Sequence, residues 1–177
     1  GVSYCATCDG AFFKGKTVAV VGGGDVAIED AIFLSRGCEK VYLIHRRNQL
    51  RGAESLQREL FARPNIEVIW DSEVTRILGE DQVESVHLKN TENGEKRNLP
   101  VEGLFVAVGV VPCTTLKGQV ALDDFEYVKA REDCVTNIPG VFAAGDLRTK
   151  PMKQIVTAVA DGANAVNSAR NYLTKKE

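Results

Sequence analysis

The stretch "TVAVVGGGDVAIEDAIFLSR", residues 17–36, decides the fold of this 177-residue chain. A β-branched run ends in three glycines, which is typical of a buried parallel strand that enters a tight turn. Apolar side chains at helical spacing follow, so we expect a helix over Asp25–Arg36 that ends before Gly37. "KVYLI", Lys40–Ile44, is the next expected strand. Together these elements form one βαβ unit and predict an α/β fold of the Rossmann type.

Further apolar runs in the sequence predict that the sheet continues beyond the βαβ unit. After the βαβ unit we expect a helix around Ala53–Phe61 and two further buried strands, Ile66–Trp70 and Gly103–Gly109. The intervening stretch from Glu73 to Val101 alternates between apolar and polar residues and contains Asn93-Gly94, a hairpin signal. We therefore expect a small antiparallel meander beside the parallel sheet.

The last third of the chain has a different organisation. We expect strands over Phe125–Ala130 and Gly140–Asp146 and a long helix from about Lys153 to Leu173. "CTTLKGQVAL", between Pro112 and Asp123, is the best candidate for a crossing between domains. The sequence thus predicts a first domain over residues 1–115 and a second over residues 116–177.

Composition excludes several classes of function. A formal net charge of -2 gives no electrostatic reason to expect nucleic acid or a membrane surface as partner. No signal peptide is visible, and no apolar run approaches the roughly 18 residues that span a bilayer. The cysteines are odd in number and scattered, unlike those of a small secreted protein: Cys5, Cys8, Cys38, Cys113 and Cys134. We expect a cytoplasmic protein.

Gly22-x-Gly24-x-x-Ala27 forms a dinucleotide-binding signature in its expected strand-turn-helix setting. The first glycine allows the tight turn, the second lets the backbone approach a pyrophosphate, and the alanine permits close packing of helix and strand. The helix that begins at Asp25 and Val26 offers unpaired N–H groups to phosphates. We therefore predict a dinucleotide site at this turn.

The end of the second strand indicates which dinucleotide binds. An NAD site needs a carboxylate there for the ribose 2′-hydroxyl. This chain instead has His45, Arg46 and Arg47, with Arg51 following. Guanidinium groups suit a 2′-phosphate, so we predict NADPH rather than NADH. The alternative is a basic turn that is merely solvated.

Cys5-x-x-Cys8 allows three interpretations: a metal clip, a structural disulfide or a redox couple. A zinc site needs two more ligands, and His45, His87 and the other cysteines show no second paired spacing, so we expect no metal. A structural disulfide around so short a loop adds little stability. A redox role fits a pair that lies beside a nucleotide-binding domain.

At this point the chain resembles the low-molecular-weight thioredoxin reductases. The motifs occur in that family's order and cover essentially the whole chain: "CATCDG", "GGGDVAIEDA", "HRRNQLR", "GLFVAVGVVP" and "IPGVFAAGD". The resemblance implies a flavoprotein, a homodimer in its full-length form, in which NADPH reduces FAD, FAD reduces the disulfide, and the dithiol reduces thioredoxin. It also implies that Cys8 faces the flavin, Cys5 exchanges with the substrate, and Asp9 manages the proton.

The resemblance extends to a flavin-contacting segment near the end of the chain. Two more expected strands end in glycine, at Gly109 and Gly145, and ligands lie beyond such strand ends in α/β sheets. Asp146 can accept hydrogen bonds from ribityl hydroxyls. The helix that opens near Lys153, Gln154 and Ile155 directs N–H groups and a positive dipole end at the flavin.

One departure from the family pattern is large. The family's upstream half, which binds the adenosine diphosphate of FAD, has no counterpart before Gly1 in this sequence. We therefore expect an NADPH-binding domain followed by only the C-terminal portion of the FAD domain. Two alternatives to thioredoxin reduction stay open: a related flavoprotein reductase that serves a peroxidase or glutaredoxin-like carrier, and an NADP-binding module without turnover.

Overall fold

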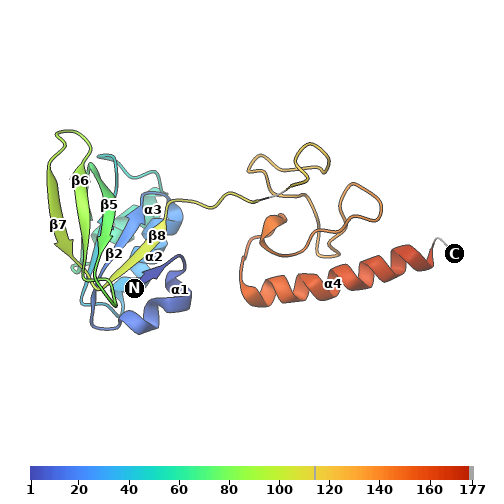
Figure 1. Cartoon of the computed structure of the whole chain (residues 1–177), viewed down its shortest axis with the longest axis horizontal. Helices are drawn as coiled ribbons and strands as arrows, with labels where there is room; N and C mark the ends of the chain where they lie inside the picture. Colours follow the sequence, from blue (N-terminus) through green and yellow to red (C-terminus); the bar gives the residue numbers. More distant parts are fainter. Residues whose placement is uncertain (114, 176–177) are drawn as a thin grey trace. The chain divides into compact units, whose positions relative to one another are not determined.

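The computed structural model describes residues 1–113 and 115–175, which belong to two compact units, Gly1–Gly109 and Val110–Glu177 (Figure 1). Each unit is described by itself. The first contains both sheets, and the second contains the longest helix.

A five-stranded parallel sheet forms the centre of Gly1–Gly109, with strand order β1-β8-β2-β3-β4. A second sheet is antiparallel, with order β5-β6-β7. The expected parallel sheet and meander are thus confirmed. The strand bounds are β1 Val2–Ser3, β2 Thr17–Gly22, β3 Lys40–Ile44, β4 Ile66–Ile69, β5 Ser72–Leu78, β6 Ser85–Asn90, β7 Lys96–Pro100 and β8 Gly103–Ala107.

The two faces of the parallel sheet pack against different layers. Alternate residues of a strand point to opposite faces, so Val18 and Val20 join the helical layer and Ala19 joins the other side. The helical layer contains α1 Ala6–Asp9, the 3-10 helix η1 Gly10–Phe13, α2 Asp25–Ser35 and α3 Glu54–Phe61. On the other face, Ala19 packs with Val86 and Leu88 of β6. Because both faces are covered, the inner strands β2 and β8 are almost entirely apolar.

One edge of this sheet gathers the segments that carry chemistry. The strands are parallel, so their carboxyl ends lie along the same edge. The Cys5 segment follows β1, the glycine turn follows β2, His45 follows β3, and Gly109 follows β8. Parallel pairing therefore brings together residues that are up to a hundred positions apart in the sequence.

In Val110–Glu177 the two expected strands, Phe125–Ala130 and Gly140–Asp146, are wrong. The described residues there form only isolated bridges, such as Val128 with Arg148. Positive φ angles interrupt the extended runs, at 69° for Glu126 and 80° for Gly145. The regular elements are the 3-10 helix η2 Gly145–Leu147 and helix α4 Ile155–Thr174.

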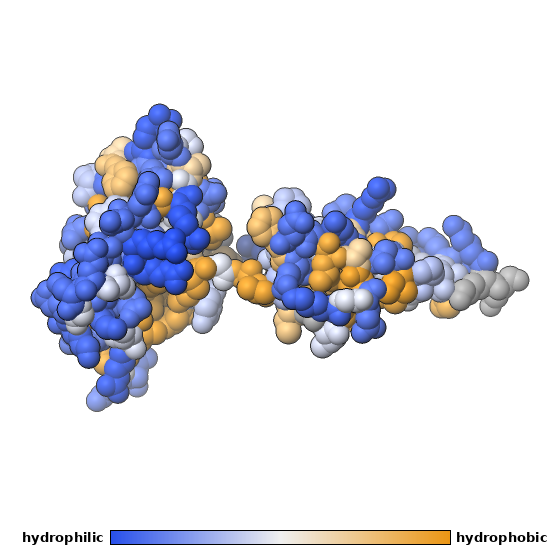
Figure 2. Space-filling model, turned by 90° about the horizontal axis from the view of Figure 1, so that it is seen from above, coloured by the Kyte–Doolittle hydropathy of each residue, from blue (hydrophilic) through white to orange (hydrophobic). Residues whose placement is uncertain are grey.

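The second unit has a small core and much apolar surface. Its buried apolar residues are Val120, Val128, Ala130 and Ala143. The space-filling view shows hydrophobic patches on this unit among hydrophilic side chains (Figure 2). Along α4 the large apolar residues that stay exposed are Ile155, Val156, Val159, Val166 and Leu173. Apolar packing within the described residues therefore fixes little of this unit.

The stability of the first unit should depend on Asp30 in α2. Burial and the neighbouring charge of Glu29 raise the pKa of Asp30 from 3.8 to about 6. The ionised carboxyl therefore destabilises the folded state at neutral pH. We expect Asp30→Asn to raise the melting temperature at pH 7.5 by about 3 °C, the effect of about 1 kcal/mol for a partly solvated group.

The stabilisation by Asp30→Asn should depend on pH, because only the ionised Asp30 carboxyl destabilises the folded state. The gain should shrink as the pH falls through about 6 and vanish below 3.8, where Asp30 is protonated in both states. Thermal melts at pH 7.5 and pH 4 measure it. A gain that is the same at both pH values would contradict the assignment.

Candidate functional site

The turn after β2 is built on glycine for steric reasons. Gly22 has a φ of 156°, and a Cβ there would lie 2.4 Å from the carbonyl oxygen of Ala107 and 2.6 Å from Cβ of Ala27. Ala27 is fully buried, so the small third residue of the signature makes this close contact. Gly24, the N-cap of α2, has no atom within 4 Å of a Cβ position. The backbone at the start of α2 is therefore open to a ligand.

A cavity of about 510 Å³ lies in front of this turn. Its walls include the turn itself, the ends of β3 and β8, and β5 of the second sheet. Most of the predicted nucleotide contacts line it: Gly22, Gly24, Asp25, Val26, His45, Arg46, Arg51 and Gly109. Arg47 is exposed but is not part of the lining. The cavity and the sequence signature thus coincide.

Backbone hydrogen bonds hold the basic loop against the glycine turn. The Arg51 N–H donates to the carbonyl oxygen of Gly23 at 2.7 Å, and the Ala53 N–H donates to Oδ1 of Asp25 at 2.7 Å. Asp25 therefore uses its carboxylate to anchor the loop. The side chains of Arg46, Arg47 and Arg51 are exposed, and none forms an ion pair with another described residue. Three guanidinium groups remain available for an anion.

The His45 side chain supports the turn from below. It is 5% exposed, and a Cβ on Gly23 would lie 2.2 Å from its Cε1. Its Nε2 lies 3.1 Å from the carbonyl oxygen of Gln49. Burial lowers the pKa of His45, which keeps the ring neutral near pH 7. The buried His45 ring therefore packs against Gly23 and supports the glycine turn.

The two predicted redox cysteines form a disulfide, Cys5–Cys8. Cys5 is the N-cap of α1, and its sulfur accepts the N–H of Cys8 at 3.2 Å. Cys8 is exposed, whereas Cys5 is half-buried. Cys8 is therefore the more exposed residue of the pair, and the Cys5 sulfur is the one that accepts a backbone hydrogen bond.

Ser3 links the disulfide to the predicted proton-handling residue. Its buried hydroxyl lies 2.7 Å from Oδ2 of Asp9, to which it donates, and it accepts the Cys5 N–H at 3.1 Å. We did not identify Ser3 from the sequence, because β1 is only two residues long and has no periodicity. Its place directly before Cys-x-x-Cys was the available signal.

The predicted flavin segment lies in the second unit. Gly145 adopts a left-handed φ of 80°, and Asp146 follows it on the surface of η2. Helix α4 begins at Ile155, where the Gln154 N–H donates to Oγ1 of Thr157 at 3.1 Å. These residues leave Asp146 and Ile155 exposed to a ligand.

Lys153 is engaged within its own unit. Its ammonium lies 4.1 Å from the centre of the Tyr127 ring and donates to the Lys150 carbonyl oxygen at 3.3 Å. Of the predicted flavin contacts, Lys153 therefore has the least freedom to reach a ligand.

Two other kinds of site, a metal centre and a helical membrane span, are absent from the part of the chain that the structure describes. No group of three or more His, Cys, Asp or Glu side chains there could hold a metal ion. None of the described helices combines the length and the apolar character that crossing a membrane requires.

Comparison with known proteins identifies the family. The family model of the pyridine nucleotide-disulphide oxidoreductases matches residues 1–162. The chain belongs to this family. It is 48% identical over 175 residues to a thioredoxin reductase of Streptomyces clavuligerus, covering 98% of this chain and 54% of that protein. A thioredoxin reductase of Listeria innocua is 45% identical, with 98% and 55% covered.

A solved structure agrees with these relatives. The thioredoxin reductase from Streptococcus pyogenes MGAS5005 superposes with a TM-score of 0.93 at 43% identity, covering 99% of this chain and 58% of that one. The chain spans a little more than half the length of the relatives it matches. The family is described by a pyridine nucleotide and a disulfide, and this chain contains a glycine turn with a cavity in front of it and a Cys5–Cys8 disulfide.

Replacement of Gly22 tests the nucleotide turn. Gly22→Ala introduces a Cβ that cannot coexist with the Ala107 carbonyl oxygen, so the turn must move. We expect the Kd of the pyridine nucleotide to rise at least about tenfold, the effect of losing one charge-assisted hydrogen bond to a phosphate. Fluorescence titration with the reduced nucleotide measures it.

The matched control is Gly37→Ala, because a Cβ there meets no atom within 4 Å. Its affinity should equal that of the wild type. A Gly22→Ala variant that is folded by circular dichroism and binds as tightly as the wild type would show that the turn does not contact the nucleotide.

Proposed function

We propose that this chain forms the NADPH-binding and disulfide-bearing part of a thioredoxin-disulfide reductase. One observation carries the proposal: the Cys5–Cys8 disulfide follows β1 and the glycine turn follows β2, at the same edge of one parallel sheet. Only β8 separates the two strands, a span of about 10 Å. The thioredoxin reductases among its relatives support the choice of substrate.

The choice of NADPH rests on charge at the end of β3. Arg46, Arg47 and Arg51 have no partner carboxylate among the described residues, so they can pair with a 2′-phosphate. The one acidic side chain of the cavity beyond the turn, Glu73, lies 3.6 Å from Nζ of Lys89 on the neighbouring strand. No carboxylate stands where NAD would need one.

FAD fits the exposed segment of the second unit. Asp146 can accept hydrogen bonds from ribityl hydroxyls, and α4 begins with the exposed residues Ile155 and Val156, while the Gln154 side chain accepts the Thr157 N–H. When bound, the nicotinamide and the flavin would together supply the two electrons that reduce the disulfide. The proposed domains follow: residues 1–115 for NADPH and 116–177 for part of the flavin site. Dimerisation and a cytoplasmic location remain predictions.

The cysteines of this chain would then perform thiol-disulfide exchange. Two electrons and two protons convert Cys5–Cys8 to a dithiol. The exposure of Cys8 favours its thiolate as the one that attacks the thioredoxin disulfide, and Cys5 then attacks the mixed disulfide and releases the reduced partner. This reverses the roles that the family resemblance implied. Asp9, which follows Cys8 in the chain and accepts a hydrogen bond from Ser3, is the residue to which we assign the proton transfer.

Cofactor preference tests the basic cluster. We expect the triple variant Arg46→Gln, Arg47→Gln, Arg51→Gln to raise the NADPH Kd about 100-fold, because charge-assisted bonds to the 2′-phosphate are lost. The NADH Kd should change less than about threefold. Calorimetric titration of the 177-residue chain measures both, since the cavity lies within one unit.

The control is Arg36→Gln, an exposed arginine at the end of α2. It should leave both affinities unchanged. Equal wild-type affinities for NADPH and NADH would refute the role of the three arginines.

Turnover and trapping test the disulfide chemistry. The full-length gene product should oxidise NADPH in the presence of FAD and thioredoxin, and Cys5→Ser or Cys8→Ser should abolish this. Mixed with a thioredoxin that lacks its resolving cysteine and whose remaining cysteine is activated as a mixed disulfide with thionitrobenzoate, Cys5→Ser should displace thionitrobenzoate and form a disulfide-linked complex, whereas Cys8→Ser should not.

Cys38→Ser, a buried cysteine distant in sequence, is the control and should retain turnover. Trapping by Cys8→Ser alone would restore the roles first expected. A wild-type protein that oxidises NADPH but leaves thioredoxin oxidised would favour a different carrier.

A further inference from the structure

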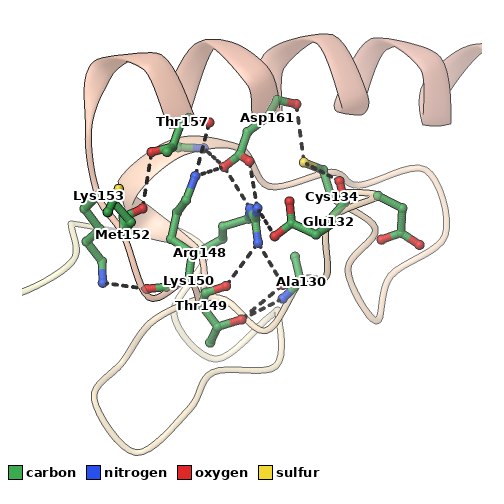
Figure 3. Close-up of polar contacts among 12 residues, drawn as sticks. Ala130, Glu132, Cys134, Arg148, Thr149, Lys150, Met152, Lys153, Thr157 and Asp161 are labelled. Carbon is green, nitrogen blue, oxygen red and sulfur yellow. Dashed lines mark hydrogen bonds and ion pairs between the residues drawn. The ribbon is translucent and has the colours of Figure 1, made fainter.

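The second unit is organised around a buried ion pair. Arg148 is 1% exposed and heads the largest fully buried side chains of the described chain, and Asp161 is 2% exposed. In the close-up, the Asp161 side chain extends from α4 toward the Arg148 guanidinium (Figure 3). Buried charges are tolerated only where they are paired and hydrogen-bonded, so this pair must be closely matched to its surroundings.

The guanidinium of Arg148 uses all of its donors. Nε and Nη2 donate to the two carboxylate oxygens of Asp161 at 2.8 and 2.7 Å, the bidentate arrangement. Nη1 donates to the carbonyl oxygens of Ala130 and Thr149, and Nη2 also reaches Glu132 at 2.9 Å. Five N–H groups thus fix this side chain to four residues, Ala130, Glu132, Thr149 and Asp161.

Asp161 accepts hydrogen bonds from several residues of the segment that precedes α4. Besides Arg148, its Oδ2 accepts from Nζ of Lys150 at 2.7 Å (Figure 3). The same oxygen accepts from the backbone N–H of Gly145 at 2.9 Å. Hydrogen bonds from Arg148, Lys150 and Gly145 lower the pKa of Asp161 well below its usual range. The carboxylate therefore stays ionised at neutral pH, and its contacts are lost only in acid.

This geometry connects two places that face a ligand. Gly145 directly precedes Asp146, and Asp161 lies in the second turn of the helix that begins at Ile155. The carboxylate thus sets the distance between the turn and the start of α4. Apolar packing cannot do so, because Gly145 has no side chain and Ile155 is 85% exposed.

We propose that Asp161 is the positioning residue of the flavin site: held by Arg148 and Lys150, it fixes Gly145 and thereby aligns Asp146 with the N-terminus of α4. This inference rests on the proposed function, which assigns those two places to FAD. Asp161 is buried on the side away from solvent and does not itself contact a ligand.

Asp161→Asn tests the anchor directly, because it keeps the shape and removes the charge. In the 177-residue chain, we expect the Gly145 amide proton to move upfield in the NMR spectrum and to exchange at least about tenfold faster. Asp124→Asn is the control, since Asp124 is exposed and makes no ion pair with another described residue. It should change neither quantity.

Flavin affinity tests the functional consequence. In the full-length gene product stripped of flavin, Asp161→Asn should raise the FAD Kd about tenfold or more, and the NADPH Kd should stay within about twofold. The double variant Arg148→Gln, Asp161→Asn removes the guanidinium that the single variant strands, while the Lys150 ammonium keeps its hydrogen bond to the carbonyl oxygen of Thr157. We expect it to recover the melting temperature but not the FAD affinity, because Gly145 still lacks a charged acceptor.

The outcomes separate the two levels of the proposal. If the wild-type protein binds FAD and the Asp161→Asn variant binds it with equal affinity, the inference about Asp161 is overturned and the proposed function is not. A double variant that recovers melting temperature and FAD affinity together would reduce Asp161 to a structural role and overturn it as well. A wild-type gene product that binds no FAD would overturn the proposed function, and the inference with it.

Discussion

The parallel pairing of β2 between β8 and β3 is the constraint on which the first unit depends. Gly22 pairs with Ala107, and Val21 pairs with Ile44, so three strands end at one level. A side chain larger than hydrogen at position 22 would meet the neighbouring strand's carbonyl oxygen. Glycine is therefore required at position 22 by the neighbouring strand, and its lack of a side chain also leaves open the cavity in front of the turn.

The same pairing brings the disulfide to the nucleotide turn. Strand β1 contains only Val2 and Ser3, yet its pairing with Leu104 and Phe105 of β8 places Cys5 at the carboxyl edge. The disulfide and the glycine turn therefore lie on one edge, about two strand spacings apart. In the proposed reductase they could not both contact one flavin in a single arrangement, so their closeness favours alternation between two arrangements.

The local sequence was sufficient to predict an element where a single pattern determines that element. The run Thr17–Arg36 predicted β2, the turn and α2 to within a residue or two, because apolar periodicity and glycine act locally. It could not predict β1, which is formed by pairing alone, nor the buried role of His45, whose neighbour Gly23 is distant in sequence. The strands expected in the second unit failed because Glu126 and Gly145 bend the chain where pairing partners are few.

The Arg148–Asp161 pair is the clearest case of a feature that sequence alone conceals. Two charged residues thirteen positions apart normally indicate solvated surface, and only the fold brings both below 3% exposure. A unit whose apolar core cluster contains four buried residues cannot hold a left-handed glycine and a helix terminus in register by packing. A bidentate ion pair can, because its geometry is directional, and removal of one partner costs about 3–5 kcal/mol. Directionality explains why charge occupies the place where a larger domain would have apolar side chains.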